Sequence, residues 1–137
     1  MAVIRGYNDS DYKDVKYNLE EAKLYIPMWD NRENLKEKIK RNPDSIIIAE
    51  EDNHAIGNLF LIEDGWSAFI FHVAVRSDYR QKGIGQKLLS YAEDNLKRQG
   101  VKAVSLFVNE NLNKVQNFYK KQGYLSIENY LGMYKLL

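Results

Sequence analysis

Cysteine is absent from this chain of 137 residues, and histidine and proline occur only twice each. Without cysteine there can be no disulfide framework, no cysteine-ligated zinc and no thiol nucleophile. The two histidines, His54 and His72, are too few for a typical histidine-rich catalytic metal site. We therefore predict no metal centre and no covalent intermediate on sulfur.

Long hydrophobic runs are also missing. The longest apolar stretch covers residues 68–75, which is far short of the roughly 20 residues that a membrane helix needs. The N-terminal stretch Met1–Arg5 lacks the basic-then-apolar layout of a signal peptide. We expect no membrane association, and the reducing cytoplasm is the simplest compartment.

A surplus of charge of one sign is missing as well. Twenty basic and nineteen acidic residues leave a formal net charge of +1. A nucleic-acid binder held mainly by phosphate contacts needs a basic surplus or a basic face, so we expect no nucleic-acid partner. The length, the hydrophobic share of 45% and the lack of linkers predict that residues 1–137 form a single domain.

Hydrophobic periodicity and turn residues predict the element order βααβββαβαββ. The predicted helices carry apolar positions three and four residues apart and cover residues 9–24, 31–41, 83–99 and 113–122. The predicted strands are rich in β-branched and aromatic residues and cover residues 2–5, 45–50, 55–62, 66–75, 104–108, 124–130 and 133–137. We expect an α/β fold whose mixed, mostly antiparallel sheet of six to seven strands is flanked on both faces by about four helices.

The most informative stretch is the loop that follows the predicted strand 66–75. Its residues Arg80, Gly83 and Gly85 form the pattern Arg-x-x-Gly-x-Gly at the start of a long helix. A helix N-terminus has unpaired N–H groups and a partial positive charge, which suit a phosphate group. Glycines also remove the Cβ atoms that would keep a phosphate from the backbone. Alternatively, these glycines only begin a helix.

Two commoner phosphate loops do not fit. The P-loop spacing does not occur after Gly83, and a dinucleotide loop needs a third glycine where this chain has Leu88. The pattern resembles the pyrophosphate loop of the GNAT superfamily of N-acetyltransferases. The resemblance covers nearly the whole chain, with residues 118–124 as its second most specific part. Residues 26–31 and 42–48 look like a branch of small stand-alone GNAT proteins, which does not fix the substrate.

The resemblance implies that acetyl-CoA lies in a wedge between the fourth and fifth strands. Its pantetheine arm would pair with main-chain groups of the fourth strand, because a splayed strand offers free N–H and C=O groups. Those strand residues are Val73, Ala74 and Val75. The pyrophosphate would bind the loop residues Arg80, Gln81, Lys82, Gly83, Ile84, Gly85 and Gln86.

The resemblance also assigns a catalytic role to Tyr119, which would donate a proton to the CoA thiolate. A phenol with a pKa near 10 is protonated at neutral pH and can do this work. Alternatively, Tyr119 is a core residue of an amphipathic helix. Related enzymes place an asparagine where this chain has Leu112, so the predicted cofactor contacts are its neighbours Asn111 and Asn113. Either asparagine could instead only cap the helix.

The general base is the least determined part of the site. His72 is the only titratable group within the predicted strand 66–75, so it is the candidate base. A buried neutral histidine with a backbone partner is an equally good interpretation. Glu63, Asp64 and Glu110 lie at strand ends and could act through ordered water, or they are solvated turn residues.

The acceptor pocket is expected between the two N-terminal helices and the end of the sheet. Its candidate wall contains Tyr25, Met28, Trp29 and Asp30, because exposed aromatic rings beside an acid suit a cationic amine. The alternative is a hydrophobic staple between the helices.

The combined prediction is an acyltransferase that moves an acetyl group from acetyl-CoA directly to a primary amine, as a monomer or homodimer. The acceptor could be a polyamine-like molecule, an amino acid, an aminoglycoside, or a protein N-terminus or lysine. The alternative is a non-catalytic acyl-CoA-binding or regulatory module on the same fold. A plain nucleotide-binding domain and an RNA-binding module are further alternatives.

Overall fold

The computed structural model describes residues 1–137 without gaps. Its strands are β1 (Val3–Gly6), β2 (Ile46–Glu51), β3 (His54–Glu63), β4 (Ser67–Val75) and β5 (Ala103–Leu106). Its helices are α1 (Tyr12–Glu21), α2 (Pro27–Asp30), α3 (Arg32–Arg41), α4 (Ile84–Arg98) and α5 (Asn113–Lys121), with short 3₁₀ turns at Asp9–Asp11 and Ser77–Tyr79. None of the helices has both the length and the apolar character needed to cross a membrane.

The chain divides into two compact units, Met1–Leu106 and Phe107–Leu137. The first unit contains the whole sheet and the helices α1 to α4. The second contains α5 and the C-terminal segment. That residues 1–137 form a single domain stays a prediction.

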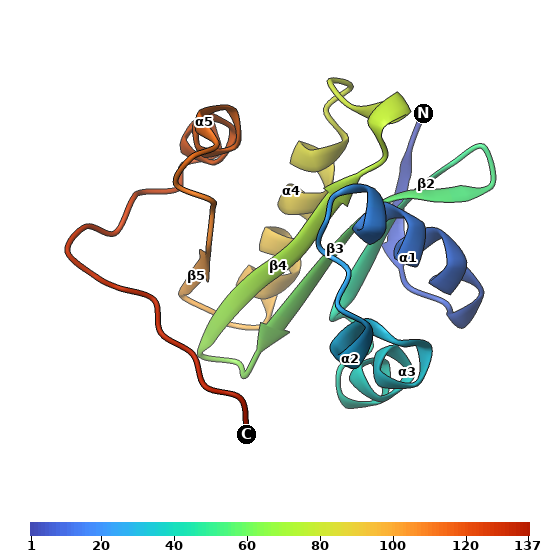
Figure 1. Ribbon diagram of the computed structural model, residues 1–137, viewed down its shortest axis with the longest axis horizontal. Coiled ribbons are helices and arrows are strands. Elements are labelled where there is room, and N and C mark those ends of the chain that lie inside the picture. Colours follow the sequence, from blue (N-terminus) through green and yellow to red (C-terminus); the bar gives the residue numbers. More distant parts are fainter. The chain divides into compact units, whose positions relative to one another are not determined.

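The sheet has the order β1-β2-β3-β4-β5 and is mixed, as predicted. The first four strands pair antiparallel, and β5 pairs parallel to β4. Figure 1 shows α1 and α4 on opposite sides of this sheet. The α/β architecture with helices on both faces is confirmed.

The two predicted C-terminal strands are wrong, and the sheet has five strands rather than six or seven. Residues 124–137 contain neither helix nor strand. Their large side chains, such as Leu125, Tyr130 and Leu137, are exposed. Strand preference depends on packing against a half-buried pleated surface, and this segment has the composition of a strand without that burial.

Each sheet face has its own core, and the apolar spacing of the helices produces both. On one face, Val15 and Leu19 of α1 and Leu35 of α3 pack against β2 and β3 and are almost fully buried. On the other, the four-residue spacing of α4 buries Ile84, Leu88, Ala92 and Leu96, as the sequence predicts. Helix α3 begins at Arg32 because the Asn31 side chain caps it by accepting a hydrogen bond from Asn34 N at 3.0 Å.

A β-bulge interrupts β4 in its middle. Asn58 pairs with Ala74 and Phe60 pairs with Phe71, so His72 and Val73 together lie opposite a single residue of β3. The backbone of His72 has a φ of 51°, which is unusual for a residue with a side chain. The bulge changes the alternation of the strand, since Phe71 and Ala74 both contribute to the core on the α1 face.

The bulge lies just beyond the point where β4 loses one of its neighbours. The pairing of β4 with β5 runs from Ser67–Ala103 to Ile70–Leu106. Residues 71–75 of β4 pair with β3 on one side and with no strand on the other. This part of β4 therefore has a free strand edge.

Buried side chains fix the bulge to β3 and α1. Asn58 is fully buried, and its Nδ2 donates to the carbonyl oxygen of His72 at 3.0 Å. Its Oδ1 accepts a hydrogen bond from Asn18 Nδ2 at 3.1 Å, and Asn18 Oδ1 accepts one from Arg76 Nε at 3.0 Å. This network connects the middle and the end of β4 to α1.

Replacing Asn58 with alanine should lower the free energy of unfolding by about 2 kcal/mol, because it removes the partner of the His72 carbonyl oxygen and one of the two acceptors of Asn18 Nδ2, which keeps its bond to Ala55 O. Urea unfolding followed by circular dichroism would measure the loss. Asn117 lies exposed on α5, so Asn117→Ala is the control and should change the value by less than about 0.5 kcal/mol. Equal effects of the two variants would contradict a structural role for the network.

Candidate active site

The loop between β4 and α4 is held in place from α1. The backbone N–H and the hydroxyl of Ser77 both donate to the carboxylate of Glu21, each at 2.8 Å. These bonds lower the pKa of Glu21, so the carboxylate stays charged. Gln81 and Gly83 then adopt positive φ values of 62° and 78°, which turn the chain sharply into α4.

The start of α4 is open and uncapped. Gly83 is the residue before the helix, no side chain caps it, and the first turn contains no acidic residue. A Cβ atom built on Gly83 would meet nothing within 4 Å. The first N–H groups of a helix have no partners inside it, so the backbone from Ile84 to Gln86 presents donors to an open space. This arrangement fits an anionic group such as a pyrophosphate.

Two basic side chains flank this loop. Arg80 Nε donates to the carbonyl oxygen of Val75 at 2.9 Å, and its guanidinium lies 3.6 Å from the carboxylate of Glu21. The amine of Lys82 lies 5.4 Å from the ring centre of Tyr79. Arg80 therefore connects the loop to the end of β4. The main-chain oxygen of Val75, a predicted contact of the cofactor, already has Arg80 as its partner.

His72 forms a close pair with Asp30. Its Nε2 lies 2.9 and 3.0 Å from the two carboxylate oxygens of Asp30, and both side chains are largely buried. Asp30 also accepts a hydrogen bond from the backbone N–H of Ile26 at 2.8 Å. The acid therefore fixes the orientation of the imidazole, and residues that are far apart in the sequence meet at one point.

A pocket of about 410 Å³ opens beside this pair, and every residue that lines it belongs to the first unit. Its walls are mostly apolar, with the rings of Trp29, Phe60, Phe69 and Phe71 around the pair. The ring centres of Phe71 and His72 are 5.1 Å apart. Because the bulge changes the alternation of β4, His72 lines the same pocket as Phe69 and Phe71.

The candidate acceptor residues separate into two groups. Trp29 and Asp30 line the pocket, whereas Tyr25 and Met28 do not. The Met28 side chain is exposed, and the hydroxyl of Tyr25 lies 2.9 Å from that of Tyr12. The prediction placed all four side chains on one wall because it treated residues 25–30 as a single surface. The turn of the short helix α2 instead separates Trp29 and Asp30 from Met28.

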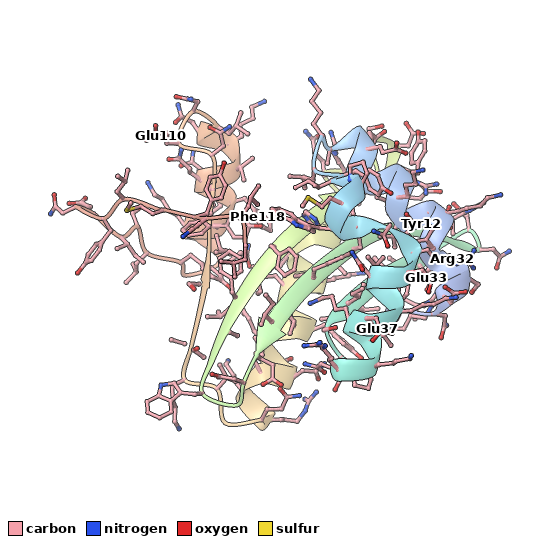
Figure 2. The ribbon with its side chains drawn as sticks, turned by 60° about the horizontal axis from the view of Figure 1, so that its bottom comes forward. Tyr12, Arg32, Glu33, Glu37, Glu110 and Phe118 are labelled. Atoms are coloured by element: carbon pink, nitrogen blue, oxygen red, sulfur yellow. The ribbon has the colours of Figure 1, made fainter.

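Tyr12 joins the three N-terminal helices near the pocket. Its hydroxyl donates to the carbonyl oxygen of Asp30 at 3.2 Å. Figure 2 shows Tyr12 on α1 close to Arg32 at the start of α3, and the guanidinium carbon lies 6.0 Å from the ring centre. Burial and the Tyr25 hydroxyl raise the pKa of Tyr12, so this phenol stays protonated and acts as a structural donor.

Lys38 is the pocket residue that sequence reasoning missed. Its Nζ donates to the carbonyl oxygen of Leu61 at 2.7 Å and lies 5.1 Å from the ring centre of Phe71. Burial lowers its pKa to about 8. The signal was present in the sequence, because Lys38 follows the buried Leu35 by three residues and therefore lies on the inward face of α3.

Two of the other acidic candidates for a base, Glu63 and Asp64, are engaged in a turn. The carboxylate of Glu63 accepts from Gly65 N at 2.8 Å, and that of Asp64 accepts from the N–H groups of Trp66 and Ser67, both at 2.9 Å. These backbone bonds lower the pKa of Asp64. Both residues stabilise the β3–β4 turn.

The second unit contains the remaining candidates. Tyr119 is buried in α5 between the rings of Phe118 and Tyr124, whose centres lie 5.1 and 5.6 Å from its own. Burial raises the pKa of Tyr119, which keeps its phenol protonated. Asn111 and Asn113 are exposed, and neither caps α5, since Leu112 occupies the cap position without a side-chain bond.

Comparisons with known proteins identify the family. A family model described as the acetyltransferase (GNAT) family matches residues 10–124. A protein from Pectobacterium atrosepticum named as an acetyltransferase is 26% identical over 125 residues, which cover 91% of this chain and 89% of that protein.

Solved structures show the same fold. Ard1 from Thermoplasma volcanium has a TM-score of 0.81 at 19% identity, over 90% of this chain and 82% of that one. An acetyltransferase from Trypanosoma brucei has a TM-score of 0.80 at 20% identity, over 98% of this chain and 100% of that one. The chain therefore belongs to the GNAT acetyltransferase family, and it is an acyltransferase.

Proposed function

We propose that this protein transfers the acetyl group of acetyl-CoA directly to a primary amine. The observation that carries the proposal is the succession of features along β4. The strand passes the pocket at His72, continues as a free edge at Val73 and Ala74 and ends in the uncapped loop before α4. At about 3.3 Å per residue, the first loop residue, Arg76, lies about 13 Å from His72.

The residues of the first unit suit acetyl-CoA, which supplies an acetyl group activated as a thioester. The free edge at Val73 and Ala74 offers main-chain groups to a peptide-like arm. The backbone from Gln81 to Gln86, with Arg80 and Lys82 beside it, offers donors and positive charge to a pyrophosphate. Asn111 and Asn113 of the second unit are proposed as further contacts.

His72 is the proposed base. An alkylammonium must lose a proton before its nitrogen can attack a carbonyl carbon, and an imidazole can accept that proton near neutral pH. The Asp30 carboxylate lies 2.9 Å from Nε2 and orients the ring. Trp29 and Asp30 are the proposed acceptor contacts in the pocket, whereas Tyr25 and Met28 lie outside it.

Tyr119 is the proposed acid for the departing thiolate. The burial that raises its pKa keeps the proton on the phenol until the thiolate forms. The neighbouring rings of Phe118 and Tyr124 limit its motion.

Replacing Gly83 with aspartate should abolish binding of acetyl-CoA, because a side chain and a negative charge would enter the open space in front of the loop. Isothermal titration calorimetry with acetyl-CoA, and with ATP and NAD as negative controls, would measure it. Gly100 also has a positive φ, 86°, and open space around it at the other end of α4, so Gly100→Asp is the matched control and should bind normally. Unchanged affinity in Gly83→Asp would exclude the loop as the binding site.

Replacing His72 with asparagine, which tolerates a positive φ, should lower kcat/KM by about 10²-fold or more. The rise of the wild-type rate with pH should also disappear. Steady-state assays of thiol release over a range of pH would test this. His54 is exposed and bonds to Asp14, so His54→Asn should keep the wild-type profile. A wild-type profile in His72→Asn would rule out the proposed base.

Replacing Tyr119 with phenylalanine should lower kcat by about 10²-fold and leave the affinity for acetyl-CoA unchanged, because only the proton donor is lost. Single-turnover assays and calorimetry on the same sample separate the two effects. A non-catalytic acyl-CoA-binding module is the alternative, and it predicts that the wild type itself shows no turnover above that of Tyr119→Phe. Tyr124→Phe, which keeps the adjacent ring, is the control.

A further inference from the structure

The pocket beside His72 contains a cationic group for which the proposed acetyl transfer gives no role. Lys38 of α3 lines this pocket, and its amine donates at 2.7 Å to the carbonyl oxygen of Leu61, which lines the adjoining cavity. The amine also lies 5.1 Å from the ring centre of Phe71. The inference below rests on the proposed function, because it concerns the acceptor of that same reaction.

No carboxylate compensates the charge of Lys38. On α3, Glu33 pairs with Lys36 and Glu37 pairs with Lys40, at 3.6 and 3.2 Å. Figure 2 shows Glu33 and Glu37 along this helix, and both side chains are mainly exposed.

The acids on the neighbouring elements are engaged as well. Glu63 at the end of β3 accepts from Gly65 N, and Asp30 of α2 pairs with His72. Lys38 has no carboxylate oxygen within 4.0 Å, and its burial alone lowers its pKa to about 8. A half-buried ammonium without a counter-charge is unfavourable, and an anionic ligand would relieve that cost.

Lys38 and His72 lie beside the same aromatic ring of the pocket. Phe71 contacts both groups, with its ring centre 5.1 Å from the Lys38 amine and 5.1 Å from the ring centre of His72. Trp29 and Phe69 complete an apolar wall. The pocket thus combines a proton acceptor, an apolar surface and an uncompensated cation.

We propose that the acetyl acceptor is a small apolar amine that also carries a carboxylate, and that Lys38 binds this carboxylate. An amino acid with an apolar body satisfies all three parts of the pocket. A charge-assisted hydrogen bond from the lysine would replace the bond that it makes to a neutral carbonyl oxygen. A polyamine does not fit, because its second ammonium would meet the cation of Lys38 inside an apolar wall.

The first experiment compares acceptors whose structures differ only at the anionic group. It expresses kcat/KM per unprotonated amine, because removing the carboxylate charge also lowers the pKa of a neighbouring amine. The pairs are phenylalanine against phenylalaninamide and 6-aminohexanoate against 6-aminohexanamide. In the first pair the amine lies close to the carboxylate or amide, and in the second it lies far from it. Wild-type protein should acetylate the carboxylate member of at least one pair with a kcat/KM about ten- to a hundredfold higher than that of its amide. Equal values within both pairs would overturn the proposal.

Variants assign the preference to Lys38. The preference should disappear in Lys38→Met and remain in part in Lys38→Arg, which keeps the charge. Lys40 is exposed on the same helix and does not line the pocket, so Lys40→Met should behave as wild type. A preference that survives in Lys38→Met would place the carboxylate elsewhere and overturn the assignment.

A second readout does not require turnover. In wild-type protein with ¹³C-labelled lysine, the ε-methylene signal of Lys38 should titrate near pH 8 and move to a higher pH with saturating phenylalanine. Phenylalaninamide should leave the titration unchanged. The same comparison is made with 6-aminohexanoate and 6-aminohexanamide, and equal titrations within both pairs would overturn the proposal.

The two proposals can fail separately. Acetylation of amides and carboxylates at equal rates would preserve the acetyltransferase reaction and reject the role of Lys38. Absence of acetylation of every amine would reject the proposed reaction, and the titration of Lys38 would still decide whether the pocket binds a carboxylate.

Discussion

The bulge at His72 and Val73 is the structural feature on which the candidate site depends. An uninterrupted β4 would direct His72 to the face that α4 covers, away from Phe69 and Phe71. The extra residue brings all three side chains to one pocket. The unfavourable positive φ of His72 is maintained because the fully buried Asn58 donates to the carbonyl oxygen at that position. This hydrogen bond between neighbouring strands therefore links the folding of β4 to the position of the proposed base.

Several charged side chains of this nearly neutral protein form ion pairs, and most of the cations without a pair lie on the surface, whereas Lys38 is half buried. Arg76 pairs with Asp14, and Arg80 approaches Glu21. Lys38 has no such partner although it is half buried. The net charge of +1 gives no sign of this buried cation, because it is a sum over the whole chain and does not describe a single pocket.

The sequence was sufficient for features that depend on local periodicity or on glycine. The four-residue spacing of α4 and the β-branched runs of β2 and β3 indicated their elements within a few residues. The pattern from Arg80 to Gly85 indicated an uncapped helix start. The bulge and the pairing of Asp30 with His72 could not be predicted in the same way, because each depends on contacts between elements far apart in the sequence. The C-terminal strands were predicted wrongly because composition indicates strand preference and not burial.

The break at Pro27 explains how an acid reaches the histidine. A proline is favourable in the first turn of a helix and unfavourable further inside. Helix α1 has already ended at Glu21, and Pro27 begins the short α2. Asp30, at the end of α2, folds back to accept the N–H of Ile26 and thereby closes this single turn. The same carboxylate then holds His72 at 2.9 Å. Because Asp30 both stabilises the turn and orients the imidazole, the geometry of the pocket wall and the orientation of the proposed base are set together.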